Sequence, residues 1–179
     1  MRRDYDTTFA GLTARRTGAV LALAMLLLGG CRSRDDDLPT IRTDIPFRSD
    51  GTLTFIGPAG DTLDAIQIEI AETDEARTRG LMGRRSLPPK SGMFFIMEET
   101  DTSGFWMRNT PLPLDIMFVA PDSQIINIVE RTTPYSEEII RPAAPKKYVV
   151  EVRAGYAQRT DLPGGTRITW TRSTTTTGS

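Results

Sequence analysis

The sequence predicts a mainly β fold, a single compact β-sandwich or partly closed barrel with one short helix. Apolar and polar residues alternate over 66–71, which is the period of a half-buried strand. Several other short apolar segments are bounded by Pro, Gly, Asp or Ser, the residues that end strands. About 120 residues lie between polar terminal segments, which is enough for one domain.

The other predicted strands follow at short intervals along the chain. They are 53–56, 93–97, 104–108, 114–120, 124–130, 148–154 and 166–171. Pro121, Asp122 and Ser123 predict a hairpin turn between the strands 114–120 and 124–130. Residues 134–145 form a long loop with three prolines, and loops of this length are often functional.

One helix is predicted after the strand 66–71. Thr73 or Asp74 caps its beginning, and Asp74 and Glu75 favour its positive N-terminal end. Gly83 is expected to end it.

The N-terminal region is typical of a bacterial lipoprotein precursor. Ala19–Leu28 is a ten-residue apolar stretch, too short to span a membrane of about 30 Å as a helix. Leu28–Cys31 has the sequence of a lipobox, in which cleavage precedes a cysteine that carries lipid. We therefore expect a signal peptide over 1–30, lipid on Cys31, and an extracytoplasmic location, with the outer membrane favoured where one exists.

The mature chain divides into three segments. We expect a polar tether over 31–51 including the lipidated Cys31, a β-rich domain over 52–172, and a disordered Thr-rich tail over 173–179. Removing 1–30 removes four arginines and two aspartates, which leaves 18 basic and 21 acidic residues and a net charge of −3. This charge disfavours nucleic acid as a partner, so the expected partners are the membrane and an envelope protein or saccharide.

The residue types present limit the possible chemistry. The chain has no histidine, which is the commonest general base near neutral pH and the commonest transition-metal ligand. Its one cysteine, Cys31, is expected to be acylated and so to offer no thiol. We expect a binding or accessory domain with no catalytic residues, no cofactor and no metal.

Several motifs, in unbroken order from about Ile66 to Ile168, resemble the domain of unknown function 192 family. They are Arg77, Arg79–Met82, Gly92–Phe95, Phe105–Thr110, Pro113–Asp115, Tyr148–Glu151 and Gly155. The resemblance implies a compact β-rich domain, commonly secreted or lipid-anchored in bacteria. It implies no activity.

The segment 105–110 carries the densest set of chemically distinct side chains. If 104–108 is a strand, Trp106, Arg108 and Thr110 face one way, and Trp106 at a rim is suited to stacking on a sugar. The predicted ligand-binding residues are Trp106, Arg108, Asn109, Thr110 and Asp115, with Arg77 and Arg79 as second choices. The expected ligand is a saccharide, another small polar molecule or an envelope partner.

Three alternatives stay open. The first is an enzyme that acts on saccharides with two carboxylates, Asp115 facing Glu151 or Glu69 across a cleft. The second is a scaffold in which Trp106 fills the core and the motifs only specify the fold. The third is a Cu(I) site built from thioethers, for which the candidates are Met82, Met93, Met97, Met107 and Met117.

Overall fold

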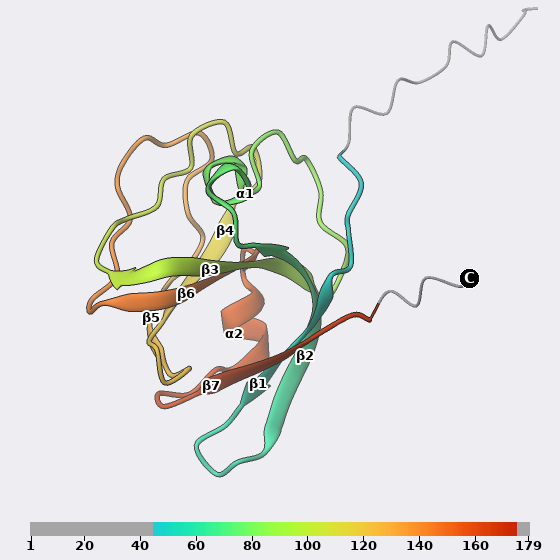
Figure 1. The fold of residues 1–179 in the computed structure, drawn as a ribbon, viewed down its shortest axis with the longest axis vertical. Helices are drawn as coiled ribbons and strands as arrows, with labels where there is room; N and C mark the ends of the chain where they lie inside the picture. The colour runs from blue at the N-terminus through green and yellow to red at the C-terminus, as the bar shows by residue number, and fades with distance from the viewer. Residues whose placement is uncertain (1–44, 175–179) are drawn as a thin grey trace, which may run out of the picture. The chain divides into compact units, whose positions relative to one another are not determined.

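The computed structural model describes residues 45–174, which form a mainly β domain (Figure 1). It has seven strands and two short helices: β1 Gly51–Ile56, β2 Thr62–Ala71, α1 Asp74–Arg79, β3 Ser91–Asp101, β4 Leu114–Val119, β5 Ile125–Val129, β6 Lys146–Arg153, α2 Tyr156–Thr160 and β7 Arg167–Arg172. The predicted fold class is confirmed. Each of the seven strands overlaps a strand expected from the sequence, and one expected strand, 104–108, is not formed.

The strands form one sheet in the order β5-β4-β6-β3-β2-β1-β7. All neighbouring strands are antiparallel except β2 and β3, which are parallel and are connected through α1. At one end of the edge strands, Gln124 bridges to Arg167, and the N–H of Ile125 donates to the carbonyl of Thr166 at 2.9 Å. The curled sheet is therefore a partly closed barrel.

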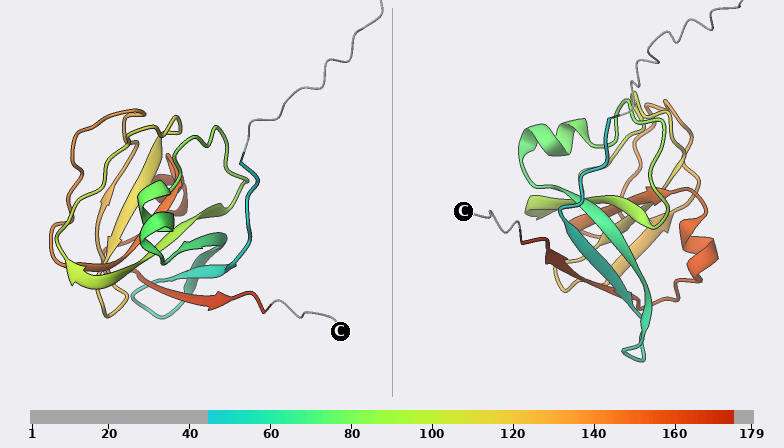
Figure 2. Two further views of the ribbon diagram at one scale, coloured as in Figure 1. Left: turned by 45° about the horizontal axis from the view of Figure 1, so that its top comes forward. Right: turned by 90° about the vertical axis from the view of Figure 1, so that its right-hand side faces the viewer.

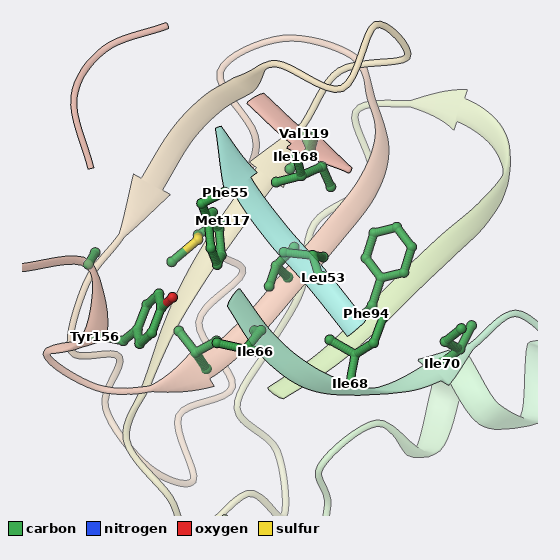
Figure 3. Packing of buried hydrophobic residues seen from close by; sticks show 13 residues of the cluster. Leu53, Phe55, Ile66, Ile68, Ile70, Phe94, Met117, Val119, Tyr156 and Ile168 are labelled. Atoms are coloured by element: carbon green, nitrogen blue, oxygen red, sulfur yellow. The ribbon is translucent and has the colours of Figure 1, made fainter. Parts of the chain in front are cut away.

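One hydrophobic cluster fills the inside of this curled sheet. Figure 3 shows side chains from β1, β2, β3, β4 and β7 converging there, with Tyr156 of α2 beside them. The ring of Tyr156 packs on Phe55 with centroids 5.5 Å apart. Helix α2 therefore closes part of the barrel interior.

A second hydrophobic cluster lies on the opposite face of the central strands. It includes Met93 and Phe95 of β3, Ile116 and Phe118 of β4, and Val149 of β6. Helix α1 and the loops after it cover this face through Ala76 and Leu81 (Figure 2). Strand β4 is consequently buried on both faces, which explains why every residue in it except Asp115 is apolar.

The structure corrects three local predictions. The expected strand 104–108 is irregular chain that makes only an isolated bridge, from Phe105 to Ile140, and Asn109 has a left-handed φ of 56°. Helix α1 ends before Gly80 rather than at Gly83. A second helix, α2, was not expected, because Gly155 at its N-cap has no side chain to cap it.

The predicted turn at 121–123 is present. The N–H of Ser123 donates to the carbonyl of Ala120 at 2.9 Å, and Ser123 has a φ of 69°. This turn connects β4 to its antiparallel neighbour β5.

Residues 45–50, which the sequence assigned to the tether, pack against the domain. The backbone N–H of Arg48 donates to Glu69 at 2.7 Å, and Asp50 accepts from the N–H of Ile70 at 2.9 Å. The expected signal peptide 1–30, the lipidated Cys31, the rest of the tether and residues 175–179 of the tail lie outside the described residues. Among residues 45–174, no helix is long and apolar enough to cross a membrane.

Candidate functional site

A cavity of about 450 Å³ opens on the face of the sheet that α1 covers. Seven of its lining side chains are apolar or aromatic and seven are polar or charged, and they come from α1 and its following loop, from β3, from residues 103–106, 110 and 139, and from β6. The lining residues are Asp74, Arg77–Met82, Phe95, Met97, Ser103–Trp106, Thr110, Ile139 and Glu151. This size is typical of pockets that take small molecules.

Helix α1 is fixed over the cavity by caps at both ends. The hydroxyl of Thr73 accepts from the N–H of Ala76 at 3.2 Å, and the N–H of Gly80 donates to the carbonyl of Ala76 at 2.9 Å. Gly80 has a φ of 45°, and a Cβ added there would lie 3.3 Å from the ring of Phe95, so glycine fits both the turn and the packing.

The mouth of the cavity depends on a close approach of two loops. Phe105 and Ile140 exchange two backbone hydrogen bonds of 2.8 Å. A Cβ added to Gly104 would lie 2.3 Å from a side-chain carbon of Ile139. Only glycine at 104 lets these loops meet and place Ile139 and Trp106 beside the opening.

Aromatic side chains form much of the wall. Trp106 is 43% exposed, although large apolar side chains are usually buried. The guanidinium carbon of Arg108 lies 5.5 Å from the centre of its ring. Deeper in the cavity, Phe105 packs edge-on against Phe95 with centroids 5.2 Å apart. The pocket therefore combines an exposed indole at its mouth with fixed phenyl rings inside.

Glu151 lies at the floor of this pocket. It is only 5% exposed, and its carboxylate makes no hydrogen bond or ion pair with any of residues 45–174. Its partners across the sheet are Met93 on β3 and Ile116 on β4, both apolar. Burial without a compensating partner raises the pKa of Glu151 to about 8.

The two other buried carboxylates in residues 45–174 have all their oxygens occupied. Glu69 receives two hydrogen bonds from the guanidinium of buried Arg84, at 2.7 and 2.6 Å. Asp115 is fully buried and accepts backbone N–H donors from Arg131, Gly155 and Ala157 at 2.9 to 3.1 Å. Glu151 differs from both because its carboxylate faces the cavity instead of protein donors.

The seven predicted ligand-binding residues divide into two groups. Trp106, Thr110, Arg77 and Arg79 line the cavity. Arg108 and Asn109 are exposed outside its lining, and Asp115 is buried where its oxygens hold the start of α2. The structure thus brings four of the seven together.

The two carboxylates of the alternative enzyme do not meet. Asp115 pairs across β4 and β6 with Val152, while Glu151 pairs with Ile116, so Asp115 and Glu151 lie on opposite faces of the sheet. Glu69 shares a face with Glu151, but it is held by Arg84. This arrangement does not favour glycoside chemistry.

The five methionines do not converge on one point. Met117 belongs to the cluster inside the barrel, whereas Met93 and Met107 belong to the cluster on the other face. Met82 and Met97 line the cavity. Four of the five therefore lie on one side of the sheet, two in the hydrophobic cluster and two in the cavity lining. This arrangement does not favour a Cu(I) site.

The two arginines of α1, Arg77 and Arg79, differ in their ion pairs and hydrogen bonds. Arg77 donates to the carboxylate of Asp74 at 2.5 Å and to the carbonyl of Ile96 at 3.0 Å, and Glu98 lies 3.8 Å away. Arg79 is exposed and makes no ion pair within the part of the chain that the structure describes. Arg77 is thus a structural cation whose charge is compensated.

Sequence reasoning ranked Glu151 only as part of an alternative and did not weigh Phe95, Phe105 or Ile139 as site residues. A signal for Glu151 is present, because an acid stands directly between two valines and so interrupts the apolar part of a strand. The aromatic wall carries no such signal, since apolar residues of β3 are equally consistent with core packing.

A curled, partly closed mainly β sheet with a small-molecule-sized pocket beside a short helix defines a compact single-domain class of protein. The chain belongs to the domain of unknown function 192 family, described as "Uncharacterized ACR", whose model matches residues 56–170. This match confirms the resemblance found in the sequence motifs.

Two solved structures are similar to this chain. A "putative transcription regulator" from Sinorhizobium meliloti 1021 has 36% sequence identity and a TM-score of 0.64, covering 70% of this chain and 98% of its own. A protein of unknown function from Novosphingobium aromaticivorans DSM 12444 has 35% identity and a TM-score of 0.63, covering 66% and 84%. A search of the curated proteins found no match.

Proposed function

We propose that this protein is a lipid-anchored extracytoplasmic binding domain whose pocket beside α1 takes a small ligand. The observation that carries the proposal is the combination of an exposed Trp106 at the mouth and an unpartnered Glu151 at the floor of one cavity. A buried acid without a partner costs stability, and an exposed indole leaves apolar surface in water, so their presence in one pocket favours a role in binding. The lipid anchor rests on the lipobox that ends at Cys31.

A saccharide, one of the ligands expected from the sequence, has few polar partners in this pocket. Ser103 already hydrogen-bonds to Asp101 and accepts from Lys146, and Thr110 donates to the carbonyl of Arg108 at 3.3 Å. Sugar hydroxyls need several such groups free. The geometry therefore favours a more apolar ligand with one polar group.

A screen of small saccharides, amines and organic anions by shift of the melting temperature tests the proposal. Compounds that bind the pocket should raise the melting temperature of the wild-type protein, and the rise should increase with the logarithm of their concentration above the dissociation constant. The shift should be lost in Trp106→Ala and retained in Tyr135→Ala, which removes an aromatic ring that is 62% exposed but lies outside the cavity lining. Absence of any stabilising compound, or equal shifts in both variants, would contradict the proposal.

A further inference from the structure

We propose that the ligand carries a small ammonium group on an apolar or aromatic body, and that this group binds the carboxylate of Glu151 at the floor of the pocket. The inference rests on the proposed function, because it names the chemistry that the same cavity recognises.

The three buried carboxylates differ in the donors that surround them. The fold supplies an arginine to Glu69 and three backbone donors to Asp115, so it compensates buried acids where they have only a structural role. Glu151 has no such donor in residues 45–174 and faces the cavity. A donor for the carboxylate of Glu151 must therefore come from a bound ligand.

The buried cation on the same strand, Lys146, does not pair with Glu151. Lys146 is fully buried, and its ammonium is paired with Asp101 and hydrogen-bonds to Ser103 at 2.9 Å. The same ammonium lies 5.9 Å from the ring centre of Phe105. One aromatic ring of the pocket wall thus already lies near an ammonium group.

The wall of the cavity is rich in aromatic rings. Phe95, Phe105 and Trp106 present aromatic rings around the cavity, and the described polar side chains other than Glu151 are engaged or lie at its edge. Aromatic faces attract cations electrostatically, most strongly where water is excluded. A carboxylate at the base of aromatic walls suits a desolvated ammonium better than a neutral polyol.

The charged groups that line the pocket do not oppose this assignment. Besides Glu151 they are Asp74, Arg77 and Arg79, all on α1. Arg77 is compensated by Asp74, and exposed Arg79 is screened by solvent. None of the three makes an ion pair with Glu151, and strands β3 and β4 present only Met93 and Ile116 beside it.

The test uses 2-phenylethylamine and its neutral counterpart 2-phenylethanol as probes. In full-length protein carrying Trp170→Phe, Trp106 is the only tryptophan and reports binding by fluorescence. The amine should bind at least tenfold more tightly than the alcohol. Calorimetry in buffers of different ionisation enthalpy should show close to one proton released per bound amine at pH 7, because the raised pKa of Glu151 leaves it protonated before binding.

Glu151→Gln is the matched variant, since it keeps the size and hydrogen-bonding capacity of the protonated acid but cannot become charged. It should weaken the amine at least tenfold, abolish the proton release and leave the alcohol unchanged. For the wild type, amine affinity should rise with pH up to about 8 and then level off. Glu151→Gln should remove this dependence of amine affinity on pH.

The outcomes separate the two proposals. Equal or tighter binding of 2-phenylethanol, or amine binding that Glu151→Gln leaves unchanged, overturns the ammonium assignment while the binding function stands. If neither probe binds at millimolar concentration, the ammonium assignment is overturned. The binding function falls with it only if the wider screen of saccharides and anions also fails.

A third probe distinguishes the source of the ammonium group. Acetyl-Ala-Lys-Ala-amide presents a lysine side chain on a peptide with blocked ends. Binding of this peptide through Glu151 would identify a protein lysine as the ligand, whereas binding of 2-phenylethylamine alone would identify a free amine. Either result supports the shared chemistry.

Discussion

The carboxylate of Asp115, on β4, accepts a hydrogen bond of 2.9 Å from the backbone N–H of Ala157 at the start of α2. Its other oxygen accepts from Gly155 and Arg131. A side chain 40 residues earlier thus caps a helix whose own N-cap is a glycine. This relationship assigns Asp115 to the architecture of the domain, although the sequence singled it out as a ligand-binding residue.

Asp115→Asn should destabilise the domain by about 3 kcal/mol, because an amide nitrogen would face buried N–H donors that need an acceptor. Urea denaturation measures the change. Asp122→Asn is the matched control: Asp122 is exposed, its only ion pair is with exposed Arg167, and an Asn side chain can still accept from the N–H of Gln124, so the change in stability should be less than about 0.5 kcal/mol. Equal losses in both variants would show that the caps at α2 contribute little.

The buried pair of Glu69 and Arg84 should be strongly coupled. Arg84→Met leaves an uncompensated buried carboxylate and should cost about 3 to 5 kcal/mol, while the double variant Glu69→Met with Arg84→Met should cost less than the sum of the single variants. A double-mutant cycle from urea denaturation gives the coupling energy. Additive losses would mean that the two charges are stabilised independently.

Glu151 should make the stability of the ligand-free protein depend on pH. Its pKa is about 8 in the folded state and near 4.5 in the unfolded state, so the unfolded chain loses this proton first and stability falls as pH rises from about 4.5 to 8. The loss should be on the order of a few kcal/mol. Glu151→Gln should not show this loss and should be more stable than the wild type at pH 8.5.

Urea denaturation of both proteins at pH 5 and at pH 8.5 checks this prediction, and the difference between them isolates the contribution of Glu151. A constant difference at the two pH values would mean that the carboxyl group is hydrated in the pocket and titrates normally.

The two tryptophans should respond differently to removal. Trp170 packs against Phe94 and Tyr148 with ring centroids 4.9 and 5.0 Å away, so Trp170→Ala should lower stability by about 2 to 3 kcal/mol. Trp106 is 43% exposed, and Trp106→Ala should change stability by less than about 1 kcal/mol while abolishing ligand binding. Thermal and urea denaturation compare the variants. A large loss of stability in Trp106→Ala would support the scaffold alternative.

Cys31 should carry lipid in a bacterial host. Expression of the full-length chain with radiolabelled palmitate should label the wild type and place it in the membrane fraction. Cys31→Ser should carry no label. Unlabelled wild-type protein released into the soluble fraction would indicate an ordinary secretory signal peptide instead.

The sequence predicted the fold class and most strands because strand periodicity and turn residues are local signals. It placed the turn at 121–123 correctly for the same reason. It failed at 104–108, where the apolar Phe105 and Met107 are buried by tertiary contacts of an irregular segment, so their alternation is not that of a strand. It also missed α2, whose capping group is distant in sequence.

The site was predictable only in part. Trp106, Thr110, Arg77 and Arg79 were identified through motifs, but which acid faces the cavity depends on strand register and on where each arginine lies. Arg84 was not considered as a partner for Glu69, since nothing in the local sequence shows that a loop residue returns to β2. Long-range pairing of charges is set by the fold as a whole.

The pairing of β1 with β7 brings together strands from opposite ends of the domain. The sheet therefore cannot be completed until β7, the last strand of the domain, is available to pair with β1. Folding that depends on such non-local contacts is slow. Under the proposed lipoprotein route the chain would cross a membrane unfolded, and slow folding would favour that crossing. The topology that shapes the barrel would then place translocation before formation of the native sheet.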